Sequence, residues 1–293
     1  MTATNLFHKV FYSYLLGLMI SAPAVFASPT DIQFFELINP TVPIQDPVIS
    51  QGGALVVQTP AGSKVWWNGK SVFVDSTGRA LVAMHRDTDQ AQLKVETHDG
   101  QDMVQNLSIK TREYKIERID GLPPAKVTAP PDPAILKRIR RESGEIRAAR
   151  KRTDDRPDFI NGFIWPVKGR ISGVYGSQRI LNGIPKTPHY GVDVAVPTGT
   201  VVVAPADGII IYANPDMYYA GGTLVIDHGH GLSSAFLHLS ALMVGSGTKV
   251  KQGQPVAKVG ATGRATGPHL DWRMNWGESV RVDPQLLVQP QTK

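Results

Sequence analysis

The chain has 293 residues, 42% of them hydrophobic, with 28 glycines, 22 prolines and a formal net charge of +6. This composition excludes an intrinsically disordered chain and indicates a turn-rich protein of two domains, because short strands need glycine and proline at their corners. The absence of cysteine excludes disulfides and thiolate metal sites, so any metal must be held by histidine and carboxylate groups.

Residues 1–27 have the organisation of a secretory signal peptide. Lys9 precedes an apolar stretch over residues 10–20, and Val25 and Ala27 satisfy the small-residue rule for cleavage. We therefore expect cleavage after Ala27 and an exported protein. The alternative is a membrane anchor that is never removed, but the apolar run is shorter than the ~20 residues that a spanning helix needs.

Residues 28–120 are predicted to form a small β-sandwich-like domain. Short segments in this region alternate apolar and polar residues and are separated by turn signals, which is typical of antiparallel strands. Asn68-Gly69 separates two such segments and is the strongest short-range signal for a hairpin. No catalytic constellation is present here, and His85 and His98 are predicted to have no catalytic role.

Residues 121–158 are predicted to be a proline-rich linker followed by a basic helix. The five prolines between 123 and 133 exclude a helix or a central strand there. Residues 134–152 have isoleucines near one helical face and eight lysines and arginines elsewhere. This helix could contact an anionic polymer or lipid headgroups, or it could be a solvated connection. No motif indicates nucleic acid.

Residues 159–293 are predicted to form a second all-β domain, because dense short strands alternate with glycine-rich turns and helical periodicity is nearly absent. Histidines and aspartates stand at its expected strand ends. His269 and Asp271, two apart on a strand, would share a face, as would His189 and Asp193 if that segment is extended. A hydrolytic metal site needs about three protein ligands, an open position for water and a nearby base.

Several motifs in this second domain resemble, in order, those of the lysostaphin/LytM-type zinc metallopeptidases, which hydrolyse peptide bonds in bacterial peptidoglycan. They are His189-x-x-x-Asp193, Leu237-His238-Leu239-Ser240 and Thr266-Gly267-Pro268-His269-Leu270, and supporting segments extend the similarity from about Ile164 to Leu287. The resemblance implies a two-sheet β-domain, one zinc ion and a location in the periplasm or cell wall. It also implies peptidoglycan as the partner, with the basic helix contacting an anionic wall or membrane surface.

Carried over position by position, the resemblance implies that His189 and Asp193 bind zinc. It implies that His238 and His269 flank the metal as catalytic residues, one activating water and the other stabilising the developing oxyanion. The family's third ligand is the second histidine of a His-x-His pair, and Asp271 stands at that position here. Aspartate is an ordinary zinc ligand, so we expect a site formed by His189, Asp193 and Asp271.

The aspartate at position 271 leaves three outcomes open. The site can be a working zinc endopeptidase, it can prefer a harder metal, or the domain can be an inactive family member that binds peptidoglycan and regulates a wall amidase. The first is favoured because both catalytic histidines are present. His228 and His230 lie in a glycine-rich turn and are predicted to be structural or rim groups. Six residues could line a peptide groove or simply pack on the surface, namely Arg179, Tyr218, Tyr219, Arg273, Asn275 and Trp276. Arg264 and Thr266, just before His269, are better groove candidates by position.

Overall fold

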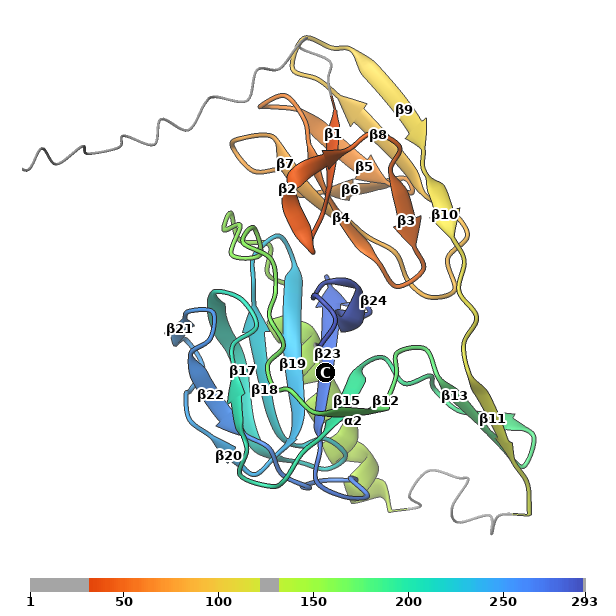
Figure 1. Cartoon of the computed structure of the whole chain (residues 1–293), viewed down its shortest axis with the longest axis vertical. Helices are drawn as coiled ribbons and strands as arrows, with labels where there is room; N and C mark the ends of the chain where they lie inside the picture. The colour runs from red at the N-terminus through yellow and green to blue at the C-terminus, as the bar shows by residue number, and fades with distance from the viewer. Residues whose placement is uncertain (1–31, 122–131, 292–293) are drawn as a thin grey trace, which may run out of the picture.

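The computed structural model describes residues 32–121 and 132–291 (Figure 1). The predicted signal peptide and the proline-rich stretch at 122–131 lie outside the described residues. Within the described part, no helix combines the length and the apolar character needed to cross a bilayer. Strands dominate both halves of the chain, which confirms the predicted all-β fold class.

The N-terminal half forms two antiparallel four-stranded sheets that enclose a hydrophobic core. Phe34 and Val57 come from one sheet and Trp67 and Leu93 from the other, and all four pack in the same buried cluster. The first sheet has the order β2(Asn39–Ile44), β1(Gln33–Glu36), β4(Ala54–Gln58), β7(Arg79–Ala83). The second has the order β6(Lys70–Val72), β5(Lys64–Trp67), β8(Gln92–Glu96), β9(Asp102–Asn106). A short parallel pair, β3(Val48–Ser50) and β10(Ser108–Lys110), completes this half.

The predicted hairpin at Asn68-Gly69 is present between β5 and β6. Trp67 pairs with Lys70 across the turn, and Asn68 and Gly69 have φ values of 48° and 74°. Two consecutive positive φ angles define the turn that best matches the twist of antiparallel strands, and asparagine and glycine adopt them with least strain. The local sequence therefore determines this connection.

The C-terminal half is built on an eight-stranded sheet. Its order is β12(Arg170–Gly173), β15(Val192–Ala195), β23(Leu270–Trp276), β19(Leu232–Leu239), β18(Gly221–Asp227), β17(Gly208–Met217), β21(Lys249–Val250), with β24(Val280–Val282) paired to β23. A smaller sheet consists of β16(Val201–Val203), β22(Pro255–Lys258) and β20(Ala241–Leu242), and the 3-10 helix η1(Pro284–Leu286) follows β24. A large and a small sheet thus form the body of this half, as the family resemblance implied, and a third, three-stranded sheet is shared with the N-terminal half.

The central strands of the large sheet alternate between core and site. Val192, Val194, Leu270 and Trp272 are fully buried in the main core. Because successive side chains of a strand point to opposite faces, the residues between them are directed to the other face of the sheet. Asp193 and Asp271 occupy these intervening positions.

The two halves are joined by strand pairing and by shared core. β11(Ile116–Ile119) pairs in parallel with β13(Gln178–Leu181), which in turn pairs with β14(Ile184–Pro185). Leu37, Leu81 and Ala83 of the N-terminal half belong to the same buried cluster as the core of the large sheet. The hydrophobic core is therefore continuous across the boundary between the halves.

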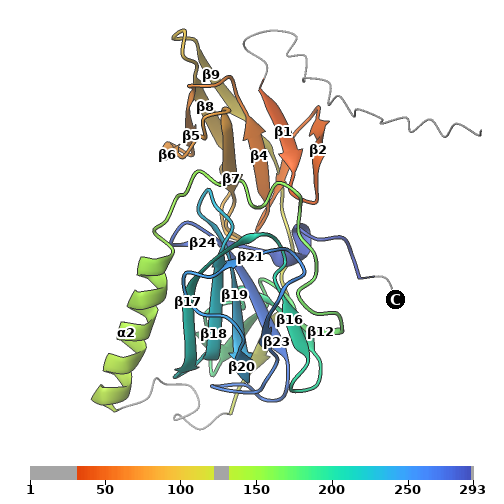
Figure 2. The same cartoon turned by 90° about the vertical axis from the view of Figure 1, so that its left-hand side faces the viewer.

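The predicted basic helix is present as α2(Pro133–Ala149), which ends three residues earlier than expected. Asp132 caps it by accepting a hydrogen bond from the Ala134 amide at 2.8 Å, and Pro133 occupies the first turn, where its missing N–H costs nothing. The helix lies along the large sheet beside β17 (Figure 2). It is thus packed against the domain rather than a free solvated connection.

Buried Glu142 attaches α2 to the sheet. Its carboxylate accepts a hydrogen bond from Arg138 Nε at 2.6 Å and another from the Tyr218 amide at 2.9 Å. We expect Glu142→Ala to lower the free energy of unfolding by about 1–3 kcal/mol, because a buried amide loses its acceptor. Urea denaturation measures this change. Lys137→Ala, at an exposed position of α2, is the control, and an equal effect of both variants would contradict the anchoring role.

Candidate active site

Three neighbouring strands bring the predicted site residues together. β15 and β19 both pair with β23, and Asp271 lies opposite Asp193 on one side and Leu237 on the other. His238 follows Leu237, and His269 immediately precedes β23. The site therefore depends on the register of three strands that are separated by many residues in the sequence.

His189, Asp193 and Asp271 form a cluster whose ligand atoms all lie within 4.8 Å of one another. His189 Nε2 is 3.1 Å from Asp193 Oδ1 and 3.5 Å from Asp271 Oδ1. His189 lies in the loop before β15 and not on the strand, so the loop, rather than an extended segment, produces its convergence with Asp193. The expected convergence of His189 and Asp193 is thus present, but the extended conformation that was expected to produce it is not.

The cluster fits a tetrahedral metal ion. His189 Nε2 and Asp193 Oδ1 are buried atoms that make no hydrogen bond of acceptable geometry within the described part of the chain. Two ligands at about 2.0–2.1 Å from a tetrahedral ion would be ~3.3 Å apart, which lies between the two observed separations. One imidazole and two carboxylates are ligands that zinc commonly accepts.

Without a metal, the carboxylates hold a proton on His189. Burial lowers the pKa of His189, but close contact with Asp193 and Asp271 outweighs burial and raises it to about 10. A metal ion must displace this proton, so apparent metal affinity should rise with pH.

The raised pKa predicts how the stability of the metal-free protein depends on pH. A raised pKa contributes stability that is complete below the ordinary value of 6.5 and is lost as pH rises toward about 10. The free energy of unfolding of chelator-treated protein should therefore fall by a few kcal/mol between roughly pH 7 and 10. Urea titrations of the wild type and of His189→Gln across this pH range test the prediction, because the variant should lack the loss of stability that comes from His189. Stability curves that fall in parallel with pH would exclude the contribution of His189.

The two predicted catalytic histidines lie side by side, with ring centroids 4.9 Å apart. His238 Nδ1 bonds the Thr262 carbonyl and His269 Nδ1 bonds the Gly267 carbonyl, both at 2.8 Å. Each Nδ1 must donate to its carbonyl, so Nε2 of a neutral ring remains free to accept a proton. Burial lowers the pKa of His238, which favours this neutral form. His269 Nε2 is 3.9 Å from Asp193 Oδ1, and so both rings border the cluster.

Arg273 holds the Asp271 carboxylate through its guanidinium group, a contact that the sequence motifs do not predict. Its Nε lies 3.0 Å from both carboxylate oxygens of Asp271, and its Nη2 is 2.6 Å from Oδ2. Burial raises the pKa of Asp271, but the charges of Arg273 and His189 outweigh it and keep the carboxyl ionised. Asp271 and Arg273 stand two positions apart on β23, so their side chains point to the same face of the strand. This spacing is the sequence feature that could have predicted their contact. The pair orients Asp271 and offsets part of the charge of two carboxylates.

Two glycines allow the carboxylates to approach. A Cβ at Gly191 would lie 2.5 Å from Asp271 Oδ1, and a Cβ at Gly173 would lie 2.2 Å from Asp193 Oδ2. Either contact is closer than real side chains allow, so any larger residue would displace a candidate ligand.

Other predicted residues divide into structural groups and surface groups. His228 is fully buried and bonds the Asp207 carbonyl and Ser234 Oγ, which makes it structural as predicted. Asn275 is also fully buried and accepts a hydrogen bond from Arg281, so its prediction as groove lining is wrong.

Arg264 lies over the ring of Tyr219 at 4.4 Å from the centroid. His85 contacts Tyr190, with ring centroids 5.3 Å apart, and so reaches the loop that carries His189.

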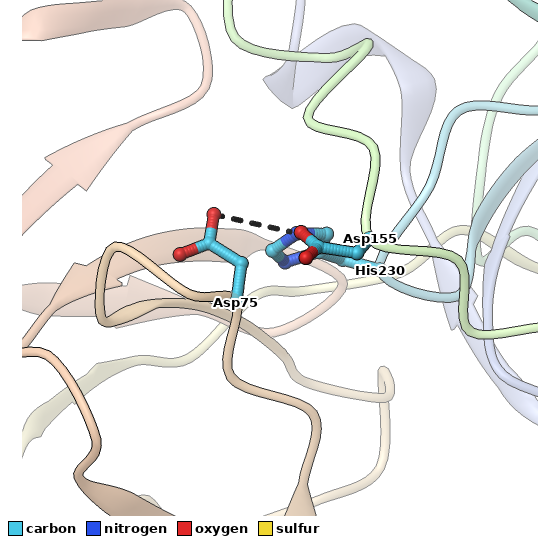
Figure 3. Close-up of side chains that lie close together, drawn as sticks. All are labelled: Asp75, Asp155 and His230. Carbon is cyan, nitrogen blue, oxygen red and sulfur yellow. Dashed lines mark ion pairs between the residues drawn. The ribbon is translucent and has the colours of Figure 1, made fainter.

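A second cluster lies where the two halves meet and consists of Asp75, Asp155 and His230 (Figure 3). His230 is buried between Phe73 and Phe159, with ring centroids 5.0 and 5.2 Å away, and its Nε2 is 3.8 Å from Asp75 Oδ2. Asp75 already accepts hydrogen bonds from Thr77 and Arg79 and pairs with the Arg79 guanidinium. Its charge is therefore already compensated, and His230 has the structural role that was predicted for it.

The whole described fold has a counterpart among solved structures. A Pseudomonas aeruginosa crystal structure described as a peptidase M23 matches with a TM-score of 0.60 and 32% sequence identity, covering 85% of this chain and 96% of that chain. The likeness therefore includes the N-terminal half as well as the large sheet.

Curated relatives match over somewhat more than a third of the chain. Peptidoglycan DD-endopeptidase ShyA of Vibrio cholerae is 40% identical over 114 residues, which cover 38% of this chain and 26% of the relative. DD-carboxypeptidase/endopeptidase Mpg of Neisseria gonorrhoeae is 42% identical over 105 residues, which cover 35% of this chain and 24% of the relative. The matched part thus spans about a quarter of the length of these relatives. Residues 187–284 match Peptidase family M23 and include all five predicted site residues. Together with the M23 structure from Pseudomonas aeruginosa, which is 32% identical and covered over 96% of its length, this match shows that the chain belongs to peptidase family M23, as the motif resemblance indicated.

Proposed function

We propose that this protein is an exported zinc-dependent endopeptidase that hydrolyses peptide cross-links or stem peptides of bacterial peptidoglycan. The observation that carries the proposal is the convergence of His189, Asp193 and Asp271 beside His238 and His269. The names of the relatives support the substrate, since ShyA is a peptidoglycan DD-endopeptidase and Mpg a DD-carboxypeptidase/endopeptidase. The proposed organisation is a signal peptide at 1–27, a β-domain at 28–120, a linker and helix at 121–158 and a peptidase domain at 159–293.

Each site residue has a defined task in this proposal. His189, Asp193 and Asp271 would hold the ion, and a bound zinc ion supplies Lewis-acid activation of water. In their neutral forms His238 and His269 each have a free Nε2, because each Nδ1 donates to a backbone carbonyl. One ring can therefore take up a proton while the other, once protonated, donates to developing negative charge on the substrate oxygen. Arg273 keeps the Asp271 carboxylate in position. The reaction class is hydrolysis of an amide bond.

Digestion of purified peptidoglycan by the mature protein tests the function directly. We expect release of soluble peptide-bearing fragments, loss of that release after treatment with a chelator, and recovery with one equivalent of zinc. Chromatography and mass spectrometry of the fragments identify the bond that is cleaved, and elemental analysis gives the metal content. A metal-bound protein that releases no fragments would exclude the endopeptidase, and a harder metal found in place of zinc would correct the cofactor.

The bidentate pairing of Arg273 with Asp271 favours one second candidate function. A carboxylate that is already neutralised by a guanidinium is a weaker metal ligand, so the domain could bind peptidoglycan without cleaving it and regulate a wall amidase. This candidate predicts metal-free protein that sediments with peptidoglycan and increases the activity of an added amidase. Near-stoichiometric zinc together with released peptide excludes it.

Export and surface attachment complete the proposal. The predicted signal peptide would deliver the protein to the periplasm or cell wall. Arg138 and Arg141 of α2 pair with acids of the chain itself, whereas Lys137, Arg140 and Arg147 are exposed. Only this second group is suited to contact an anionic wall or membrane surface, and salt-dependent sedimentation with peptidoglycan or anionic vesicles tests that contact.

A further inference from the structure

A pocket of about 730 Å³ lies between α2 and the large sheet, next to the candidate active site. Four arginines line it, namely Arg147 and Arg150 near the end of α2, Arg273 of β23 and Arg281 of β24. It borders the metal cluster through Arg273, which holds Asp271, and through Leu237, which lies opposite Asp271. We call this feature the arginine pocket.

The acids of the arginine pocket do not balance its arginines. Two acids, Glu142 and Glu278, are among the lining residues. Glu142 accepts hydrogen bonds from Arg138 and the Tyr218 amide, and Glu278 lies 3.9 Å from Lys151 outside the lining set. Arg273 is already paired with Asp271, so the excess positive charge of the pocket comes from Arg147, Arg150 and Arg281.

Among the four arginines of the pocket, Arg150 is the one whose buried guanidinium group most clearly lacks a partner. It is 8% exposed, and its Nε is buried without a hydrogen-bond partner within residues 32–121 and 132–291. Burial, together with the charges of Arg281 and Arg273, lowers the pKa of Arg150 to about 9. Burial likewise lowers the pKa of Arg281, with a further contribution from Arg273. The guanidinium groups of Arg150 and Arg281 thus repel each other across the pocket, and Arg273, whose charge Asp271 partly offsets, adds to this repulsion.

The repulsion among these arginines destabilises the protein when the pocket is empty, and a bound anion would relieve it. Burying an unpaired charge is costly, and native structures pair nearly all buried polar groups. A guanidinium offers a planar fork of donors that matches a carboxylate or a phosphate. The pocket also has apolar walls from Ile139, Ile146, Met217, Ala235 and Leu237. These walls suit the aliphatic parts of a peptide better than a bare inorganic ion.

We propose that the arginine pocket binds a free carboxylate of the peptide substrate, with Arg150 and Arg281 as its contacts, and so selects acidic peptides for the neighbouring metal site. This inference rests on the proposed function for the identity of the ligand. The binding of the carboxylate itself requires no turnover. Arg273 is shared between the two sites, since it lines the pocket and holds Asp271.

Calorimetry tests the inference on the full-length mature protein carrying His238→Ala, which slows turnover. The probes are acetyl-D-Ala-D-Ala as the free acid, the same peptide as its C-terminal amide, and inorganic phosphate. We expect the acid to bind at least tenfold more tightly than the amide, and Arg150→Met to remove that difference. Arg281→Met should do the same, and Arg141→Met, an exposed arginine on α2 outside the pocket, should leave it unchanged.

Thermal unfolding separates a binding defect from a folding defect. Arg150→Met removes an unpaired buried charge, so its melting temperature should equal or exceed that of the parent protein. If this variant nevertheless unfolds, the Arg281→Met result decides. Equal affinities for acid and amide, or an acid preference that survives both variants, would overturn the proposal. Phosphate that binds through Arg150 while acid and amide do not differ would overturn it in favour of a phosphate ligand.

Failure of the arginine pocket can be distinguished from failure of the proposed endopeptidase function. Protein that fails to digest peptidoglycan but shows an acid preference that depends on Arg150 would retain the pocket and lose the endopeptidase. Protein that digests peptidoglycan but binds acid and amide equally would retain the endopeptidase and lose the pocket.

Discussion

Replacing Asp271 should remove the metal and with it the hydrolytic activity. Changes to residues that only orient a ligand typically reduce metal affinity 10–100-fold, so loss of a direct ligand should reduce it by more than ~100-fold. Asp271→Asn is the informative variant, because it keeps the size of the side chain and removes its charge. Elemental analysis and competition with a chromophoric chelator measure the affinity, and peptide release from peptidoglycan measures the activity.

Loss of the Asp271 charge also leaves Arg273, whose side chain is 31% exposed, without its partner. Breaking a fully buried ion pair costs about 3–5 kcal/mol. The cost here is lower because Arg273 is half-buried, but a loss of stability can still be mistaken for a loss of metal. The double variant Asp271→Asn/Arg273→Met removes both charges and keeps the comparison interpretable. Asp216→Ala, an acid whose side chain is 83% exposed, is the control. Full metal occupancy in a folded double variant would show that Asp271 is not a ligand.

Replacing either His238 or His269 by alanine should reduce the catalytic rate and leave the metal in place. Proton transfer by a positioned side chain contributes roughly 10²–10⁴-fold to a rate, and the free Nε2 of each ring is the group that would be lost. We expect kcat to fall by that range for each variant, with zinc content unchanged. Rate measurements on a defined peptide substrate and elemental analysis on the same preparations provide both values.

The double variant His238→Ala/His269→Ala extends this test. If the two histidines act in one proton-transfer arrangement, the combined loss should be smaller than the product of the single losses. The exposed His98→Ala controls for loss of a histidine as such. A loss of zinc in either single variant would instead assign that histidine as a ligand.

Local sequence was sufficient for the elements whose determinants are short-range. The alternation of apolar residues predicted strands in both halves, Asn68-Gly69 predicted its hairpin, and the prolines before residue 134 placed the start of the helix within one residue. Spacing also predicted that His269 and Asp271 act on one face, because side chains at i and i+2 of a strand point the same way. The order of the motifs indicated the family.

Tertiary structure decided which charged groups meet. The register that places Asp193 opposite Asp271 is a pairing between strands 78 positions apart, and no local pattern specifies it. Arg273 could have faced a peptide groove or a carboxylate, and only the folded arrangement directs it to Asp271. The same holds for α2, which was interpreted as a basic surface helix. The apolar side of α2 and Glu142 pack the helix onto the sheet and bury Arg150 opposite Arg273 and Arg281. The energy of burying one face of a helix depends on the surface that covers it, which the residues of the helix alone do not specify.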